Sequence, residues 1–250
     1  MENIFHIKFE DKIEHIEKNL DIVELTRKTV LRLWREKFAD EIYAVLSSFL
    51  PVEKNIIDYI EGAPGIDEEF MLDYVLTALK SKQYDLIIWD TAPTASILNL
   101  LKVQYLFYTH LTQAQKVYIT LKSVIKSENP LNLIKKWRKL TEEIIDMLKN
   151  NTSAWIVTNP ERLPVEQALS LGNALKNFGI SINGYILNKL LAENICKSCE
   201  FLNSKRLSQQ IWKNSLYQRS KLPIKTVTEM LGDATEKEKL LKISNFLYKN

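Results

Sequence analysis

Two cysteines, six glycines and seven prolines are few for a chain of 250 residues, and each scarcity excludes a class of protein. Two cysteines cannot build a disulfide scaffold, so we expect a reducing, cytoplasmic setting. The low glycine and proline content argues against a low-complexity or disordered chain. The formal net charge is only +3, and nucleic-acid binding usually requires a clustered basic surface, so we expect no nucleic-acid partner.

Long apolar runs are also absent. No stretch reaches the roughly 18 apolar residues that a membrane-spanning helix needs. The first residues, Met1 to Ile4, have neither the basic region nor the apolar core of a secretory signal. We therefore expect a soluble protein. With 46% hydrophobic residues, the chain can bury a full core, which favours one large α/β domain with a helical lobe.

The central stretch of the chain runs from Tyr84 to Thr94. Residues 86–90 form a short apolar run that ends in Asp90, and a turn signal and a helical segment follow. This pattern predicts a buried parallel strand with a polar residue at its tip. Because ligands in open α/β sheets bind beyond the carboxyl ends of the strands, Asp90 is a candidate site residue. An aspartate that merely caps the next helix is the alternative.

The remaining pattern predicts a mostly parallel α/β sheet flanked by helices. Apolar residues at three- and four-residue spacing predict a helical lobe over approximately 21–80 and 97–149. A strand, a helix over 165–178 and a second strand form a βαβ element, which favours parallel pairing. A polar helix is predicted from Asp11 to Leu20. The core strands are predicted near residues 3–8, 84–90, 153–158, 182–188 and 221–226.

The run Asp90-Thr91-Ala92-Pro93-Thr94 closely resembles the switch motif DTAPTGHT of the arsenical-pump ATPase family, which includes the ATPase that delivers tail-anchored membrane proteins. The resemblance implies that Asp90 lies near magnesium and the attacking water, with Thr91 and Thr94 beside the nucleotide. Ala95 and Ser96 stand where the family has Gly and His. The resemblance covers nearly all 250 residues as a single ATPase domain, and it implies a P-loop NTPase-like fold that is incomplete at the N-terminus.

Two segments after the lobe carry the same resemblance. The run Pro160-Glu161-Arg162-Leu163 is similar to the family's PE-x-L pattern, and residues 186–191 are similar to its V-x-N-x-L segment. The family's asparagine at the position of Asn188 reads the adenine base, and an amide offers both a donor and an acceptor for that purpose. A cap at the strand end is the alternative role. The resemblance also implies that Glu161 and Pro223, the latter within the last predicted strand, line the nucleotide.

The run Cys196-Lys197-Ser198-Cys199 is open to three interpretations: a zinc half-site, a redox pair or two buried thiols. One pair supplies two of the four ligands of a structural zinc, and a two-fold dimer would supply the other two. The targeting ATPase of the family has this arrangement, followed by a helix like residues 200–217 here, and the arsenite pump subunit lacks it. The resemblance therefore implies Zn²⁺ shared across a homodimer and favours the targeting branch.

Four aromatic residues fall in the second half of the predicted lobe: Tyr105, Phe107, Tyr108 and Tyr118. In the family this region holds the hydrophobic helix of a membrane-protein client, so the resemblance implies such a partner. Packing of these rings into the core of the lobe is the alternative, because an interaction surface requires a contiguous exposed patch.

No P-loop is found in the sequence, since none of its six glycines precedes a Lys-Ser or Lys-Thr pair. The family implies ATP and Mg²⁺, but Asp90 and Asn188 alone neither position nor neutralise the phosphates, so we expect no hydrolysis by this chain alone. Without a P-loop strand two apolar strand edges would stay open. We therefore expect a separate P-loop-bearing polypeptide or a truncated reading frame. The competing functions are a non-catalytic zinc-linked adaptor or holdase and a subunit of an arsenite-transporting ATPase.

Overall fold

The computed structural model describes residues 2–5, 7–63, 65–91, 94–120, 129–192, 198–230 and 237–248. The chain divides into two compact units. The sheet unit comprises residues 1–8 and 149–250, and the helical unit comprises residues 9–148. Each unit is described by itself.

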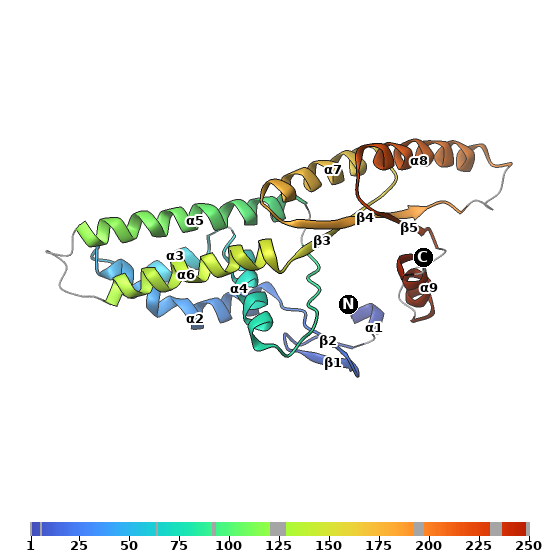
Figure 1. The fold of residues 1–250 in the computed structure, drawn as a ribbon. Coiled ribbons are helices and arrows are strands. Elements are labelled where there is room, and N and C mark those ends of the chain that lie inside the picture. Colours follow the sequence, from blue (N-terminus) through green and yellow to red (C-terminus); the bar gives the residue numbers. More distant parts are fainter. Residues whose placement is uncertain are drawn as a thin grey trace. The chain divides into compact units, whose positions relative to one another are not determined.

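The sheet unit is built on three parallel strands in the order β3-β4-β5. Helix α7 (Arg162–Asn177) connects β3 (Ser153–Thr158) to β4 (Ser181–Leu190). Helix α8 (Glu200–Arg219) then leads to β5 (Ile224–Thr228) and packs beside α7 (Figure 1). The βαβ element predicted from the sequence is confirmed, because apolar strands and an amphipathic helix alternate there as parallel pairing requires.

One face of this sheet is covered by α7. Ile156 and Thr158 of β3 are buried, whereas Trp155 and Val157 on the opposite face are exposed. Since successive side chains of a strand point to opposite faces, the alternation marks the covered face directly. β3 is also the last strand of the described sheet, so the main-chain groups along its outer edge have no partner strand among the described residues.

Helix α9 (Lys237–Tyr248) packs beside β5 on the sheet. The Lys225 ammonium of β5 donates a hydrogen bond to the carbonyl of Leu247. The same ammonium lies 5.6 Å from the ring centre of Trp155 and 5.3 Å from that of Tyr248. Cation–π contacts of this kind join the last helix to the face that α7 leaves uncovered.

The helical unit begins with α2 (Arg27–Ser47), α3 (Ile56–Glu61) and α4 (Ile66–Ser81). Pro51 follows α2, and Gly65 precedes α4 with a φ of 92°, a left-handed conformation that glycine adopts without strain. The three helices share one apolar core whose buried members are Val30, Trp34, Ile57 and Phe70. Helices are thus found where the apolar spacing predicted them, over part of residues 21–80.

Two long helices, α5 (Thr94–Thr120) and α6 (Asn129–Asn150), form the second layer of the helical unit. They are antiparallel neighbours, because Tyr108 donates to Glu142 and Arg138 donates to Gln115 at 2.7 Å. A second core lies between them, with Leu111, Tyr118, Leu131 and Ile134 buried. None of the described helices is long and apolar enough to cross a bilayer.

The polar helix predicted over residues 11–20 is wrong. A hairpin of β1 (Glu14–Glu17) and β2 (Leu20–Ile22) lies there instead. Burial alternates along β1 with the period of a strand. Asp11 has a φ of 57° and accepts hydrogen bonds from the main-chain N–H and the hydroxyl of Thr26, the residue that caps α2. Asp11 therefore holds the N-cap residue of α2 in place.

Two predicted strands are also wrong. Residues 3–8 hold the short helix α1 (Glu2–Phe5), and no described strand pairs with them. Residues 84–91 run between α4 and α5 in no strand, with Leu86 75% and Ile88 84% exposed. The apolar run of a parallel strand becomes a strand only when neighbours supply its hydrogen bonds, and none of the described strands lies beside residues 84–91. The last predicted strand, 221–226, is found two to three residues later as β5.

Candidate functional site

The segment with Asp90 is anchored at its start to the hairpin. The Tyr84 hydroxyl donates to one carboxylate oxygen of Asp21 at 3.1 Å, and His15 Nδ1 lies 2.8 Å from the other. These hydrogen bonds, that of His15 first, lower the pKa of Asp21. Beyond Tyr84, residues 85–91 form neither helix nor strand, and α5 begins at Thr94. The segment is therefore fixed at one end by the hairpin and at the other by a long helix.

Asp90 itself is exposed, and among the described residues no hydrogen bond or ion pair engages its carboxylate. Thr91 is exposed as well, whereas Thr94 begins α5 and its side chain lies outside the described residues, as do Ala92 and Pro93. Magnesium prefers carboxylate and other oxygen ligands, usually with several waters retained. The exposed carboxylate of Asp90 fits that chemistry.

The carboxyl ends of β3 and β4 meet at one edge of the sheet. Thr158, the last residue of β3, is paired with Leu187 of β4, so Asn188 lies just beyond that pair. Glu161 follows β3 in an extended conformation as the N-terminal cap residue of α7, and it is exposed. Two of the predicted nucleotide residues, Glu161 and Asn188, are thus brought to the same edge.

The half-buried side chain of Asn188 is oriented by its own main chain. Its Oδ1 atom accepts a hydrogen bond from the main-chain N–H of Lys189 at 2.9 Å. This contact leaves the amide group of Asn188 as a donor and its oxygen with a second lone pair. An adenine edge, which presents an acceptor beside an amino donor, matches these two functions.

Pro223 lies at the amino end of β5, whereas Asn188 lies toward the carboxyl ends of the parallel strands. Its carbonyl accepts a hydrogen bond from the N–H of Tyr185 at 2.9 Å, and Tyr185 pairs with Ile224 at the beginning of β5. The approach is close at Gly184, where an added Cβ atom would lie 2.4 Å from the Pro223 carbonyl oxygen. The structure therefore separates Pro223 from Asn188, and the sequence pattern gave no sign of this because β5 begins later than predicted.

The predicted zinc pair is described in part. Cys199 is a half-buried free thiol at the N-terminal cap position of α8, and Cys196 lies outside the described residues. A cysteine thiolate is a suitable zinc ligand. In the portion of the chain that is described, no group of three or more histidine, cysteine, aspartate or glutamate side chains gathers to hold a metal.

The four aromatic residues of the lobe divide between core and surface. Tyr118 is buried, and Phe107 packs partly buried against the α5–α6 core. Tyr108 is half-buried and bonded to Glu142, whereas Tyr105 lies at the surface. The core-packing alternative is confirmed for Tyr118 and Phe107. No client-binding surface was predicted from other residues, although the neighbouring Leu106 of α5 is exposed.

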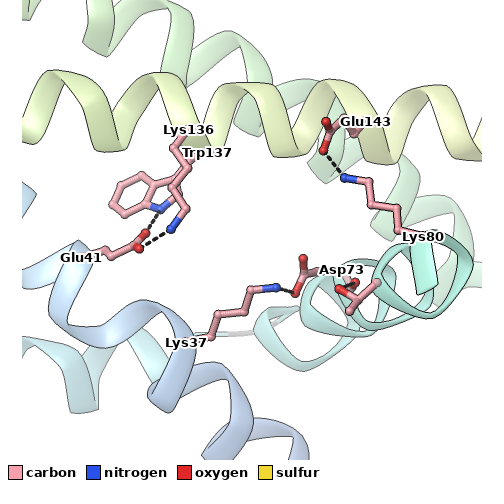
Figure 2. Close-up of polar contacts among 8 residues, drawn as sticks. Lys37, Glu41, Asp73, Lys80, Lys136, Trp137 and Glu143 are labelled. Atoms are coloured by element: carbon pink, nitrogen blue, oxygen red, sulfur yellow. Dashed lines mark hydrogen bonds and ion pairs between the residues drawn. The ribbon is translucent and has the colours of Figure 1, made fainter.

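Polar contacts that sequence reasoning missed join α6 to α2 and α4 (Figure 2). Glu41 accepts hydrogen bonds from the ammonium of Lys136 and from Trp137 Nε1, the latter at 2.8 Å. Lys80 of α4 donates to Glu143 of α6 at 2.6 Å. Each pair combines residues far apart in the sequence, so periodicity within a single helix could not reveal it.

Two more side chains were missed. Gln209 of α8 is buried and bonded at both ends of its amide to the main chain that follows Asn188. Burial raises the pKa of Glu69, near the start of α4, to about 7. Gln209 stands in a polar helical segment, and Glu69 belongs to an acidic first turn, so neither residue is distinctive in the sequence.

Comparison with known proteins identifies relatives of this chain. Residues 1–249 match the family model described as anion-transporting ATPase. An Aquifex aeolicus protein named as an arsenical pump-driving ATPase is 27% identical over 82% of this chain and 71% of its own length. An ATPase ASNA1 homolog of Entamoeba dispar is 27% identical over 62% of this chain and 50% of its own length. An ATPase get3 of Pyrenophora tritici-repentis is 26% identical, over 77% of this chain and 62% of its length.

Proposed function

The chain belongs to the anion-transporting ATPase family, and from that premise we propose that it is the adenine-reading and client-handling part of a targeting-type ATPase. In this proposal a P-loop-bearing polypeptide completes the nucleotide site. The observation that carries the proposal is the side chain of Asn188 at the carboxyl end of β4. Its oxygen accepts one hydrogen bond from the N–H of Lys189, which leaves a second lone pair and the amide donor for a ligand. Relatives named ASNA1 homolog and get3 support the targeting branch.

Each site residue has a separate task in this proposal. The amide of Asn188 binds the adenine edge, and Glu161, which lies at the same edge, faces the solvent beside it. Asp90 holds magnesium directly or through water, with the hydroxyls of Thr91 and Thr94 nearby in the sequence. The ion neutralises phosphate charge when it is bound. We assign no adenine contact to Pro223, because it lies at the amino end of β5.

The open edge of β3 supports the proposed P-loop-bearing partner. The outer main-chain groups of β3 have no partner strand among the described residues. An edge of this kind is a template for a further strand. The apolar segment with Leu86 and Ile88 lacks a strand partner as well. A strand added from another polypeptide would satisfy either set of main-chain groups.

Zinc and the homodimer are part of the same proposal. Cys199 starts α8 with a free, half-buried thiol, and with Cys196 it would supply two of four zinc ligands, the partner copy supplying the others. Light scattering with elemental analysis tests this directly. We expect a dimer with about one zinc per two chains, which the double change Cys196→Ser and Cys199→Ser converts to a zinc-free monomer. A dimer that persists without zinc contradicts it.

Nucleotide binding is tested by the melting temperature of the purified chain with Mg·ATP and with Mg·GTP. We expect ATP to stabilise more than GTP, since a ligand at 100 times its Kd adds about 2.7 kcal/mol. Asn188→Ala should remove this difference. Asn183→Ala is the matched control, because Asn183 lies at the other end of β4 and bonds to Ser153. Equal effects of the two nucleotides on the unmodified chain would refute adenine reading.

A non-catalytic, zinc-linked adaptor or holdase is the second candidate. It is favoured by the printed sequence, which has no Gly-Lys-Ser or Gly-Lys-Thr run, and by exposed apolar side chains of the helical unit such as Leu50 and Leu106. A chain that prevents aggregation of an apolar helix but responds to neither nucleotide fits this candidate. A third possibility, a subunit of an arsenite-transporting ATPase, requires that arsenite stimulate ATP hydrolysis in the completed complex.

A further inference from the structure

A side-chain amide takes the place of a missing strand at the end of β4. Gln209 of α8 is 5% exposed. Its Nε2 atom donates to the carbonyl of Lys189 at 3.0 Å, and its Oε1 atom accepts from the N–H of Leu191 at 2.8 Å. A residue of a neighbouring parallel strand makes this same pair of bonds, to main-chain groups two residues apart. Gln209 thereby continues the β4 ladder beyond the last β3 pair at Leu187.

The segment that Gln209 holds is irregular. Between Leu187 and Leu190 the register with β5 shifts, since these residues pair with Thr226 and Thr228. One extra residue is therefore accommodated on β4, which is a β-bulge. Lys189 within it has a φ of 56°, a left-handed conformation that is uncommon for a residue other than glycine. Bulges of this kind occur next to active sites, where they redirect a side chain.

Both sides of the bulge are fixed by hydrogen bonds. On the β5 side the N–H of Glu229 donates to the Leu190 carbonyl at 2.7 Å. On the other side Gln209 binds the main chain before and after Leu190. At Lys189 itself, the N–H is bound by Asn188 and the carbonyl by Gln209. A left-handed residue persists where its surroundings hold it from several directions, as they do here.

We propose that Gln209 is a positioning residue, which stabilises the bulge at Lys189 and so aims the Asn188 amide out of the carboxyl edge of the sheet. This inference rests on the proposed function, in which Asn188 reads adenine. Gln209 acts through Lys189 and touches no ligand. Helix α8, which lies beside β4 (Figure 1), thereby influences nucleotide preference through the main chain of β4 and without touching the nucleotide.

The experiment uses three variants of the full chain. Gln209→Leu removes both bonds with little change in volume. Gln209→Glu retains an acceptor for Leu191 and loses the donor to Lys189. Gln210→Leu is the matched control, because Gln210 is the exposed neighbour on the same helix and bonds to Asn214. If Gln209→Leu does not fold, Gln209→Glu carries the test.

The first measurement does not depend on nucleotide. Amide hydrogen exchange at Leu191 should be at least tenfold faster in Gln209→Leu, while exchange at Val165 in α7 stays unchanged. The NMR signals of the Asn188 side-chain amide should shift in Gln209→Leu and remain in place in Gln210→Leu. Unchanged exchange at Leu191, or an unmoved Asn188 signal, would overturn the positioning role.

The second measurement is the ratio of ATP to GTP affinity. We expect Gln209→Leu to lower this ratio toward one with GTP affinity unchanged, Gln209→Glu to lie between, and Gln210→Leu to match the unmodified chain. A ratio that survives in Gln209→Leu overturns the proposal even if exchange is faster. If the unmodified chain prefers neither nucleotide, the proposed function fails, and the Asn188 signal still decides whether Gln209 positions that side chain.

Discussion

In the helical unit, side chains of opposite charge join one helix to another, as Lys37 of α2 joins Asp73 of α4. In the sheet unit, the neutral amide of Gln209 joins a helix to the main chain of a strand. An ion pair between long side chains tolerates small shifts of the helices, because several rotamers keep the charges close. A two-bond contact to the main chain tolerates little movement, because both atoms are fixed by geometry.

This difference suits the two proposed tasks. A lobe that receives a client helix must rearrange its helices, and contacts that re-form in new geometry permit this. An edge that distinguishes one base from another must hold an amide in one orientation, since discrimination depends on polar groups left unpaired by the wrong ligand. Four predictions test the comparison, beginning with the largest expected effect.

Removing the charge from Lys37 should cause the largest loss. The Asp73 side chain is 6% exposed, so Lys37→Met leaves a buried carboxylate without its cation. We expect the free energy of unfolding of the helical unit to fall by about 3 kcal/mol, measured by urea denaturation. The control Arg32→Met removes an exposed pair with Glu36 and should cost less than about 0.5 kcal/mol. Equal losses in the two variants would contradict our account of the buried pair.

A methyl group at Gly184 should destabilise the sheet unit. The added Cβ atom would lie 2.4 Å from the carbonyl oxygen of Pro223 and 2.8 Å from the Trp155 ring, so strand β5 must move. We expect Gly184→Ala to cost about 2 kcal/mol in the same urea experiment. Gly62→Ala is the control, because its Cβ atom meets nothing closer than 3.5 Å. If both variants are as stable as the unmodified chain, the main chain around Gly184 can shift without cost. The claim that the sheet unit tolerates little movement would then be wrong.

The third prediction concerns pH and Glu69. Burial raises the folded-state pKa of this carboxyl to about 7, above its ordinary value of 4.5. The folded state then binds more protons between these two values, so stability falls as pH rises through this window. Glu69→Gln should remove that slope and stabilise the helical unit at pH 8 by about 1 to 2 kcal/mol. The measurement is the melting temperature of both chains from pH 5 to 8. If the stability of Glu69→Gln still falls as pH rises, a group other than Glu69 causes the pH dependence.

The smallest effect is expected at the exposed pair of Glu166 and Arg219, which joins α7 to α8 in the sheet unit. The hydrogen bond from Arg219 lowers the pKa of Glu166. A lowered carboxyl pKa stabilises the folded state above the ordinary value and loses this effect as pH falls through the folded-state value. Glu166→Gln should therefore change the melting temperature only slightly at pH 7, and less in high salt. A large change would mean that ion pairs matter equally in both units.

Some of this architecture follows from local pattern. Strand β3 was predicted with its observed bounds, and α7 within a few residues, because apolar runs, amphipathic spacing and Gly179 as a helix terminator are local signals. Helix α8 was expected from the family resemblance. The hairpin at residues 14–22 was missed because its strands are short and polar, and helical and strand patterns are hard to distinguish over so few residues.

The site was predictable only where one residue carries the signal. The local pattern predicted a polar residue, Asn188, at the end of an apolar strand, whereas its adenine role came from the resemblance and stays a prediction. The bulge at Lys189 was not predicted, because it depends on the register with β5, and Gln209 was not, because its partners lie 18 and 20 residues away. The segment ending in Asp90 has the apolar pattern of a buried strand. Whether it forms one depends on an adjacent strand to share its main-chain hydrogen bonds, and the local sequence does not specify that strand.

The parallel sheet also has a consequence for the order of events during synthesis. Ser153 pairs with Ser181, and Tyr185 pairs with Ile224. Each pair of strands can therefore form only after the helix that connects the two strands, and the second strand, have been synthesised. The core of α2, α3 and α4, which gathers Val30, Trp34, Ile57 and Phe70, is translated long before β5. Because chain ends close more slowly over longer separations, we expect the helical unit to be folded on the ribosome while β3 and β4 still await their last strand.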